Sequence, residues 1–201
     1  MSDKLRIDKF KGALAGGGSR ANLFEVVINK PAMLSGGALN STAANGDLNM
    51  LVKAAVLPAS DINPIPVPFR GRTLQVPGDR TFQPWTLTII NDTDFKIRDF
   101  FEDWMNQLSD HVDGTGVGGD WDNFAVNMQV HQLNRQGNRI KSYTIHDCWP
   151  SQLSEIGVDY GQENTIQEFS ATLQMTYWTA QASAEGSKIA TTSQSNKTAV
   201  N

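Results

Sequence analysis

Cysteine is almost absent from this sequence of 201 residues, and the single one, Cys148, cannot form an internal disulfide. Nothing in the sequence therefore indicates an oxidising compartment, and we expect the chain to fold in a cytosol. Long apolar runs are also lacking, because no window of about 18 apolar residues occurs and the N-terminus has no apolar signal-peptide core. We expect neither a membrane-spanning helix nor export by a signal peptide.

Charge is scarce as well. Charged residues make up 19% of the chain, below the about 25% that is usual for soluble domains. The 17 Lys and Arg are outnumbered by 21 Asp and Glu, which gives a net charge of −4. Because affinity for phosphate comes mainly from basic side chains that release counterions, this balance argues against tight binding of nucleic acid. It does not exclude DNA passing nearby.

The length suits one domain with two appendages, at about 150 residues per domain. Residues 1–20 mix charges with a run of three glycines and predict a flexible N-terminal arm with at most one short helix. We place the domain at residues 21–178, with a polar, Gly-rich loop at 33–49. Residues 179–201 are rich in Ala, Ser, Thr, Gln and Asn, and this composition predicts a flexible C-terminal tail.

Hydrophobic periodicity predicts a mainly β domain. Apolar and polar residues alternate in several segments, and the predicted strands are 22–28, 85–90, 124–131, 140–145 and 169–177, with 51–57 as a further strand or connecting segment. Residues 97–108 instead carry apolar side chains at spacings of three and four, which predicts one amphipathic helix. Such a helix can cover one face of a sheet.

Proline is concentrated in residues 58–80, which hold Pro58, Pro64, Pro66, Pro68 and Pro77. Proline lacks a backbone donor and disfavours helix, so this segment is predicted to be extended, at a sheet edge or in an arm. Two interpretations stay open here. The segment is either a long surface loop or an arm that lies on a neighbouring subunit, stiffened so that docking loses less entropy.

Motifs for catalysis or cofactor binding are weak. Residues 114–119 match GxGxxG, but the predicted helix precedes this run and a strand follows it, the reverse of a dinucleotide site. Asp113, Asp120 and Asp122 lack the spacing of an EF-hand. His146, Asp147 and Cys148 are adjacent on a predicted strand, where neighbours point to opposite faces. We therefore predict no catalytic residues, no metal site and no cofactor.

Several segments together resemble the tail tube proteins of contractile-tailed (myovirus-type) bacteriophages. The resemblance extends from Asn22 to Trp178 and departs from the family at 33–49 and at both termini. Its most discriminating part is the block Pro-Gly-Asp-Arg-Thr-Phe at 77–82, with Trp85 downstream. The other segments that carry it are 22–26, 55–59, 85–88, 91–92, 149–150, 155–156, 166–169 and 173–178.

The resemblance implies a β-sandwich or half-barrel of antiparallel strands with one flanking helix. It also implies hexameric rings whose sheets join across subunits into a continuous inner β-barrel, stacked as the conduit for DNA ejection inside a contractile sheath. The implied partners are further copies of the chain, the tail sheath protein, the baseplate and tail terminator proteins, and phage DNA in transit without specific binding. The implied location is the virion tail, after assembly in the host cytoplasm.

Two sets of candidate site residues follow. The proline-rich arm would reach between subunits, and its candidate interface residues are Ile65, Pro66, Val67, Phe69, Arg70, Arg72, Asp79 and Arg80. A tube that conducts DNA must not hold it, so we expect a bore that is polar and free of Lys and Arg. The candidate lumen-facing residues are Asn127, Gln129, Ser170, Thr172, Gln174 and Thr176, which sit on uncharged strand faces and could equally face the sheath.

Two alternatives remain at this point. The first is a tube subunit of a bacterial contractile injection or type VI secretion system, in which the bore carries protein effectors. The second, from another class, is a small ligand-binding β-barrel or hydrolase. A closed apolar pocket within one subunit would support that second hypothesis.

Overall fold

The computed structural model describes residues 7–14, 18–34, 49, 51–116 and 120–182. Most of the predicted 33–49 loop and of the C-terminal tail lies outside these ranges, as do residues 1–6 and 15–17 of the N-terminal arm. The elements are α1 (Ile7–Ala13), β1 (Phe24–Val27), β2 (Val52–Ala55), β3 (Ser60–Phe69), β4 (Arg72–Phe82), β5 (Trp85–Ile90), α3 (Lys96–Leu108), α4 (Trp121–Phe124), β6 (Val126–Leu133), β7 (Arg139–Leu153), β8 (Glu168–Gln174) and β9 (Tyr177–Ala182). The predicted mainly β architecture with one long flanking helix is confirmed.

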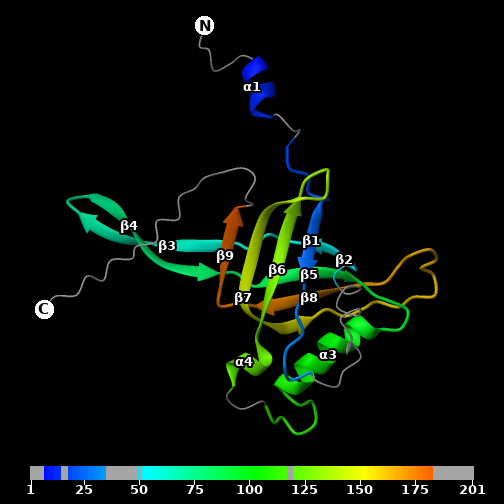
Figure 1. Cartoon of the computed structure of the whole chain (residues 1–201). Coiled ribbons are helices and arrows are strands. Elements are labelled where there is room, and N and C mark those ends of the chain that lie inside the picture. Colours follow the sequence, from blue (N-terminus) through cyan, green and yellow to red (C-terminus); the bar gives the residue numbers. More distant parts are fainter. Residues whose placement is uncertain (1–6, 15–17, 35–48, 50, 117–119, 183–201) are drawn as a thin grey trace, which may run out of the picture.

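Strand β7 holds the sheet together because it belongs to both of its halves. Residues 139–148 of β7 pair with β6, and residues 141–146 also pair with β9, whereas residues 149–153 pair with β8. All these pairings are antiparallel. We call β1, β6, β9 and the first part of β7 the β6 half-sheet, and β2, β5, β8 and the last part of β7 the β8 half-sheet (Figure 1).

The bend in β7 lies at Asp147. This residue has a positive φ of 58°, which is unfavourable for residues other than glycine, asparagine and aspartate, and the pairing with β6 shifts register beside it. The Asp147 N–H donates a hydrogen bond of 3.2 Å to Asn127 Oδ1. Asn127 thus supplies the acceptor that the bulged backbone would otherwise lack.

The core lies between the two half-sheets and α3. Strands β5 and β8 alternate buried and half-buried residues along their whole lengths, as the sequence predicted for β5. Trp85, Leu87 and Ile89 face Phe169, Ala171 and Leu173 across these strands, and all are buried. The β6 half-sheet adds Val26, Met128, Val130 and Ile145.

Helix α3 closes the core with its aromatic row. Its fully buried Phe101 contacts Phe169 of β8 with ring centroids 6.3 Å apart, and Trp104 donates a 3.1 Å hydrogen bond to the Phe124 carbonyl. Both carboxylate oxygens of Asp92 accept from first-turn N–H groups, those of Lys96 and Ile97. Asp92, three residues before the N-cap residue Phe95, therefore provides acceptors for two N–H groups that have no partner within the helix.

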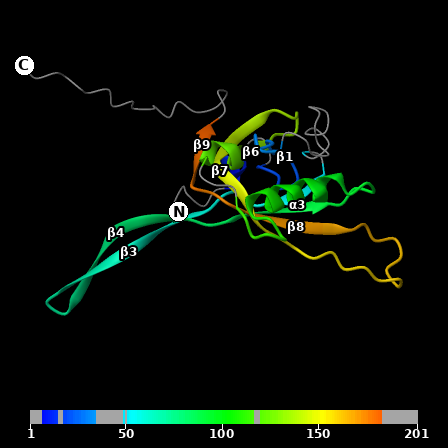
Figure 2. The same ribbon diagram turned by 90° about the horizontal axis from the view of Figure 1, so that it is seen from below.

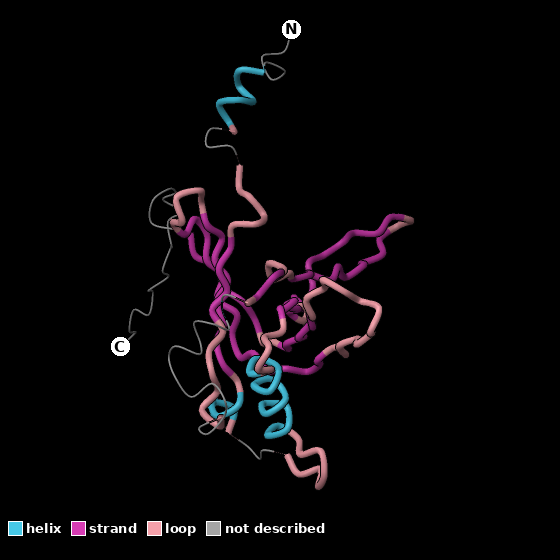
Figure 3. The backbone as a smooth tube through the Cα atoms, turned by 90° about the vertical axis from the view of Figure 1, so that its right-hand side faces the viewer, coloured by secondary structure: helices cyan, strands magenta, loops and turns pink. Residues whose placement is uncertain are grey.

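Strands β3 and β4 form a separate two-stranded hairpin that projects from the body (Figures 2 and 3). Four of the five prolines of 58–80 thus lie in extended strands, as predicted, whereas Pro58 lies in the connection before β3. Three details differ from the sequence-based expectation. The last strand is interrupted after Gln174, which leaves Thr176 outside any strand, and β9 continues to Ala182, past the expected boundary at Trp178. Phe124 ends α4 instead of starting a strand.

Candidate assembly surfaces

The β3–β4 hairpin has one apolar face. Antiparallel partners project to the same side of a ladder, so the pairs Ile65–Val76, Val67–Leu74 and Phe69–Arg72 share a face. The opposite face carries Pro64, Pro66 and Pro68 with their partners Pro77, Gln75 and Thr73. Phe69 and Leu74 are 66% and 64% exposed. The described chain therefore leaves uncovered an apolar column that one subunit cannot bury by itself.

The hairpin turn is a two-residue loop, Arg70-Gly71. Both residues have positive φ, 43° and 80°, the conformation of a type I′ turn whose twist matches the flanking strands. The Arg70 guanidinium lies 5.4 Å from the centroid of the Phe69 ring. The tip thus combines an exposed ring with two arginines, Arg70 and Arg72.

The alternate prolines shape the outer edge of β3. With Phe69–Arg72 as the closing hydrogen-bonded pair, residues 65, 67 and 69 exchange hydrogen bonds with β4, and the backbone groups of residues 64, 66 and 68 point outward. All three outward positions are proline and have no N–H. That edge can accept hydrogen bonds but cannot donate them, which protects an otherwise exposed strand from random edge pairing.

The structure explains why the Pro-Gly-Asp-Arg-Thr-Phe block has a glycine at position 78. Gly78 lies where the pairing of β3 and β4 shifts register, and a Cβ atom there would be 2.5 Å from the Asn63 carbonyl oxygen and 2.9 Å from Ile65 Cγ1. Only glycine fits this close approach.

The eight predicted interface residues are all exposed on the hairpin but do not form one patch. Ile65, Val67, Phe69 and Arg72 share the apolar face, whereas Pro66 lies on the opposite face. Arg70 occupies the turn, and Asp79 and Arg80 flank the register shift near the base. Within the described residues, no ion pair is formed by Arg70, Arg72 or Arg80.

The predicted lumen residues fall into two groups that the structure does not bring together. Ser170, Thr172 and Gln174 line the outward face of the β8 half-sheet, where Thr172 Oγ1 lies 3.4 Å from Thr86 Oγ1 and Gln174 donates to Ser151 Oγ. Asn127 and Gln129 belong to β6, in the other half-sheet. Thr176 lies between β8 and β9, and its N–H donates to the His146 carbonyl.

The outward face of the β6 half-sheet is mostly polar, and β1 contributes Val27 as well as Glu25 to it. The register places Gln129 opposite Thr144 and His131 opposite Ser142, and Thr144 in turn opposite Thr179 of β9. His131 Nδ1 lies 2.8 Å from Ser142 Oγ, and His146 Nε2 lies 3.1 Å from Thr179 Oγ1. Sequence reasoning missed Ser142, Thr144 and Thr179, because only the pairing with β6 shows which face of β7 and β9 they share.

Basic side chains are scarce on this face. Among the described residues that the register places there, the charged one is Glu25 of β1. It forms a 2.9 Å ion pair with Arg139, which reaches the face from the turn end of β7. Arg139 is therefore paired with a carboxylate of its own subunit.

The β6 half-sheet also has a free edge on each side in the described chain. Its order is β1, β6, β7, β9, so β1 and β9 each pair on one side only. Neighbouring strands are antiparallel throughout, which makes β1 and β9 run in opposite directions.

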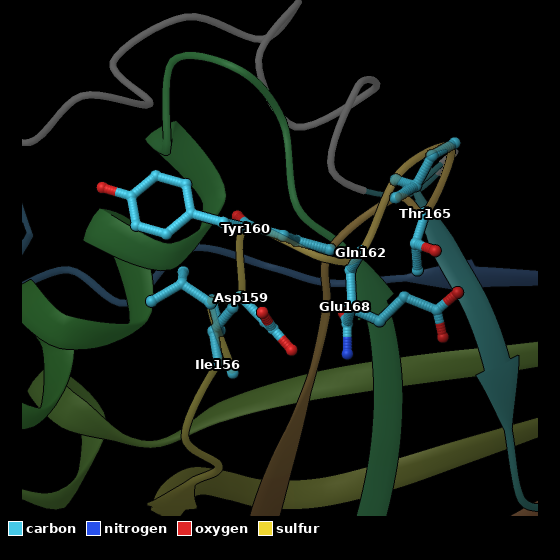
Figure 4. Close-up of a pocket in the computed structure, with 10 residues that line it drawn as sticks. Ile156, Asp159, Tyr160, Gln162, Thr165 and Glu168 are labelled. Atoms are coloured by element: carbon cyan, nitrogen blue, oxygen red, sulfur yellow. The ribbon is translucent and has the colours of Figure 1, made fainter.

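A further surface is the loop between β7 and β8, which we call the acidic loop (residues 155–167). It encloses an open hollow of about 620 Å³. Figure 4 shows the ring of Tyr160 pointing away from Asp159, Gln162 and Glu168. Glu168 pairs with Lys53 at 2.5 Å, whereas Glu155, Asp159 and Glu163 have no ion pair within the described residues. This open hollow differs from the closed apolar pocket expected of a ligand-binding barrel.

The cluster His146, Asp147 and Cys148 does not converge. Cys148 is buried in the core, where burial raises the pKa of its thiol to about 12. His146 lies on the outward face and stacks on Tyr177 with centroids 4.4 Å apart, and Asp147 forms the bend.

Among the described residues, His, Cys, Asp and Glu do not gather into a group that could hold a metal ion. None of the described helices is both long and apolar enough to cross a membrane.

Comparison with known proteins agrees with this geometry. The family model described as "Phage tail tube protein" matches residues 19–181. The chain is 35% identical to tail tube protein gp19 of Enterobacteria phage T4 over 130 residues, which cover 63% of this chain and 77% of the relative. It is 24% identical to the tail tube protein of Serratia phage KSP90 over 169 residues, 83% of this chain and 92% of that one.

Solved structures of similar fold come from contractile injection machines. The cap of the anti-feeding prophage tube matches with a TM-score of 0.58 and 15% identity, covering 83% of this chain and 92% of that chain. A chain of the sheath–tube complex of an extracellular contractile injection system matches with a TM-score of 0.57 and 14% identity, covering 86% and 97%. These likenesses concern the fold, whereas the family match spans most of the sequence, and the chain therefore belongs to the phage tail tube protein family.

Proposed function

We propose that this chain is a structural subunit that assembles into stacked hexameric rings, forming the inner tube of a contractile phage tail and the conduit for DNA ejection. The observation that carries this proposal is the β6 half-sheet, a strip of antiparallel strands with a free edge on each side and a polar outward face. A free edge at both sides lets each subunit pair with two neighbours.

Rotational symmetry makes the closure antiparallel. In a ring, every subunit has the same orientation relative to the axis, so β1 of one copy would meet β9 of the next. Because β1 and β9 run in opposite directions within the subunit, they would meet as antiparallel strands, like every other pair of the half-sheet. Closure then removes both exposed edges and yields a continuous inner barrel.

The outward face of the β6 half-sheet would line the bore. We assign Gln129 to the lumen together with Ser142, Thr144 and Thr179, and we assign Ser170, Thr172 and Gln174 to the outer side of the tube. DNA can slide past a polar face without unpaired basic groups, because each phosphate contact with Lys or Arg would add affinity that moving DNA must lose again. The Glu25–Arg139 pair is consistent with this requirement.

The β3–β4 hairpin would provide the contact between subunits. Ion pairs of exposed arginines contribute only about 0–1 kcal/mol each, so we expect Ile65, Val67 and Phe69 to be the main anchors. Pro66, Arg70, Arg72, Asp79 and Arg80 would fix the position of the hairpin on its neighbour. The alternate prolines stiffen β3 before docking, which reduces the entropy lost on assembly.

The proposed partners follow from the same architecture. We propose that the outer face contacts a tail sheath protein and that the ends of the tube meet baseplate and terminator proteins, in the virion tail, after assembly in the host cytoplasm. No catalysis and no cofactor enter this role. A tube subunit of a protein-injecting machine is the second candidate, supported by the fold neighbours, but the identity to phage tail tube proteins is higher.

Electron microscopy of the purified protein over a range of concentrations, with and without tail baseplates as seeds, tests the proposal. We expect rings or hollow filaments, in parallel with a shift to large species in size-exclusion chromatography. A protein that stays monomeric even when seeded would contradict the proposal.

A further inference from the structure

Two exposed surfaces at opposite ends of the subunit complement each other in charge and in apolar character. We propose that the tip of the β3–β4 hairpin docks into the hollow of the acidic loop on a second copy of this chain. This inference rests on the proposed tube function and adds to it the surface that receives the hairpin.

The hairpin tip is basic and apolar. Phe69 and Leu74 are about two-thirds exposed, and Arg70 and Arg72 flank them without an ion pair in the described chain. The register places Arg72 directly opposite Phe69, so an arginine and a ring leave the tip on the same side. A partner for this tip needs carboxylates next to apolar side chains.

The acidic loop offers those two features. The sequence contains no Lys or Arg between Lys141 and Lys188, so no Lys or Arg lies close in sequence to Glu155, Asp159 and Glu163. Exposed apolar side chains lie next to these carboxylates in the loop, since Val158 is 80% exposed, Ile166 is 67% exposed and Tyr160 is fully exposed. The hollow beside them has a volume of about 620 Å³, and Val158, Asp159, Tyr160 and Ile166 are among the residues that line it.

The positions of the two surfaces require a second copy. Figures 1 and 2 place the hairpin and the acidic loop at opposite ends of the molecule, so the tip cannot reach the loop of its own chain. In Figure 2 both lie in the layer of β8 and α3, and not in the layer of β6 and β9. A contact between unlike surfaces at opposite ends is heterologous, and its repetition forms a ring when the rotation between neighbouring copies closes, as in the hexamer proposed above.

The same direction of assembly satisfies both proposed contacts. In Figure 1 the hairpin extends beyond the β9 side of the β6 half-sheet, and the acidic loop lies on the β1 side. When β9 of one copy pairs with β1 of its neighbour, the hairpin of the first copy therefore points toward the acidic loop of the second. One neighbour receives both the strand edge and the tip.

Charge exchange tests the docking. We expect Arg70→Glu with Arg72→Glu to raise the protein concentration needed for tube assembly by about tenfold or more, because like charges would face each other. Asp159→Lys with Glu163→Lys should do the same. The variant carrying all four substitutions should assemble again. As a mismatched control, the arginine substitutions combined with Asp113→Lys, between α3 and α4, and Asp122→Lys, in α4, should not restore assembly.

Cross-linking provides a second test, which remains valid even if the charge variants fail to fold. Leu74→Cys and Val158→Cys proteins are mixed, assembled and treated with a short thiol cross-linker, while buried Cys148 stays silent. We expect a covalent dimer from this mixture and none from Leu74→Cys mixed with Val112→Cys, which exposes a thiol elsewhere.

The outcomes separate the two proposals. If the wild type forms tubes but the Leu74→Cys and Val158→Cys proteins do not cross-link, the docking is overturned and the tube function is not. The same holds if the variant with all four charge substitutions fails to assemble. A wild-type protein that forms no rings or tubes even with baseplate seeds would overturn both.

Discussion

Cys148 is the single thiol of the chain, and its side chain is buried between the half-sheets, where it donates weakly to the Ile145 carbonyl at 3.6 Å. Burial raises its pKa to about 12, so the reactive thiolate is scarce at neutral and mildly alkaline pH. We expect no labelling by a thiol reagent at pH 8 in native protein and rapid labelling in urea. Native labelling as fast as that of an exposed Leu74→Cys thiol would contradict this burial.

His131 makes stability depend on pH. Desolvation by burial lowers its pKa from the ordinary value of 6.5, Arg139 lowers it further, and Glu25 opposes this. The unfolded chain therefore binds a proton more readily than the folded one, so stability is complete above about pH 6.5 and falls as the pH decreases below it. Melting temperatures between pH 7.5 and 5 should decrease less for His131→Asn than for the wild type. Equal decreases would contradict the role of His131.

The hairpin requires glycine at position 78 because a Cβ atom there would lie too close to β3, and not because the residue has a positive φ. In Gly78→Ala the new methyl group would meet backbone and side-chain atoms of β3, so we expect a distorted hairpin and loss of tube assembly. The hairpin is outside the core, and the free energy of unfolding of the body should change by only about 0.5 kcal/mol or less. Urea unfolding and electron microscopy measure the two effects. The matched hairpin variant Thr73→Ala should assemble normally, and normal tubes from Gly78→Ala would refute the requirement.

At the scale of elements, α3 is attached by its aromatic row. Phe101 is fully buried and contacts the rings of Phe100, Trp104 and Phe169. We expect Phe101→Ala to reduce the free energy of unfolding by about 3–5 kcal/mol, measured from urea midpoints. Asp103→Ala on the exposed side of the same helix should change it by less than about 0.5 kcal/mol. Similar effects of the two substitutions would show that α3 does not close the core.

Elements with a local periodic signal could be predicted from the sequence. β5 matches its predicted range, and α3 begins only one residue before the apolar pattern, because alternation and three-four spacing are properties of neighbouring residues. The bend at Asp147 and the break between β8 and β9 were not predicted. Both depend on which strands pair, and pairing joins residues that are distant in the sequence.

For the candidate surfaces too, the sequence predicted local features but not those that depend on strand pairing. Alternate prolines predicted an extended segment, but not the hairpin, since Arg70-Gly71 is not among the strong two-residue turn signals. The predicted lumen residues were chosen because their faces lack charge, and that criterion could not tell the outward face of one half-sheet from that of the other. The acidic loop was missed, although the absence of Lys and Arg from 142 to 187 could have been seen in the sequence.

At the scale of the whole molecule, β9 decides whether a ring can close. A chain ending at Trp178 keeps the side chain that contacts Tyr143 but loses most of the strand, so we expect a folded monomer that forms no closed rings. A chain ending at Ala182 retains all of β9 and should form tubes. Size-exclusion chromatography and electron microscopy distinguish the two. Tubes from the shorter chain would show that β9 is not the closing edge.

The central claim is that subunits join through β1 and β9 around a neutral bore. A cryo-electron microscopy reconstruction of assembled tubes tests it most directly, because it locates every strand relative to the axis. The claim predicts six subunits per ring, antiparallel pairing of β1 with β9 of the neighbour, and Gln129, Thr144 and Thr179 facing the lumen without a row of unpaired Lys or Arg. A lumen lined by Ser170, Thr172 and Gln174, or by unpaired basic side chains, would contradict it.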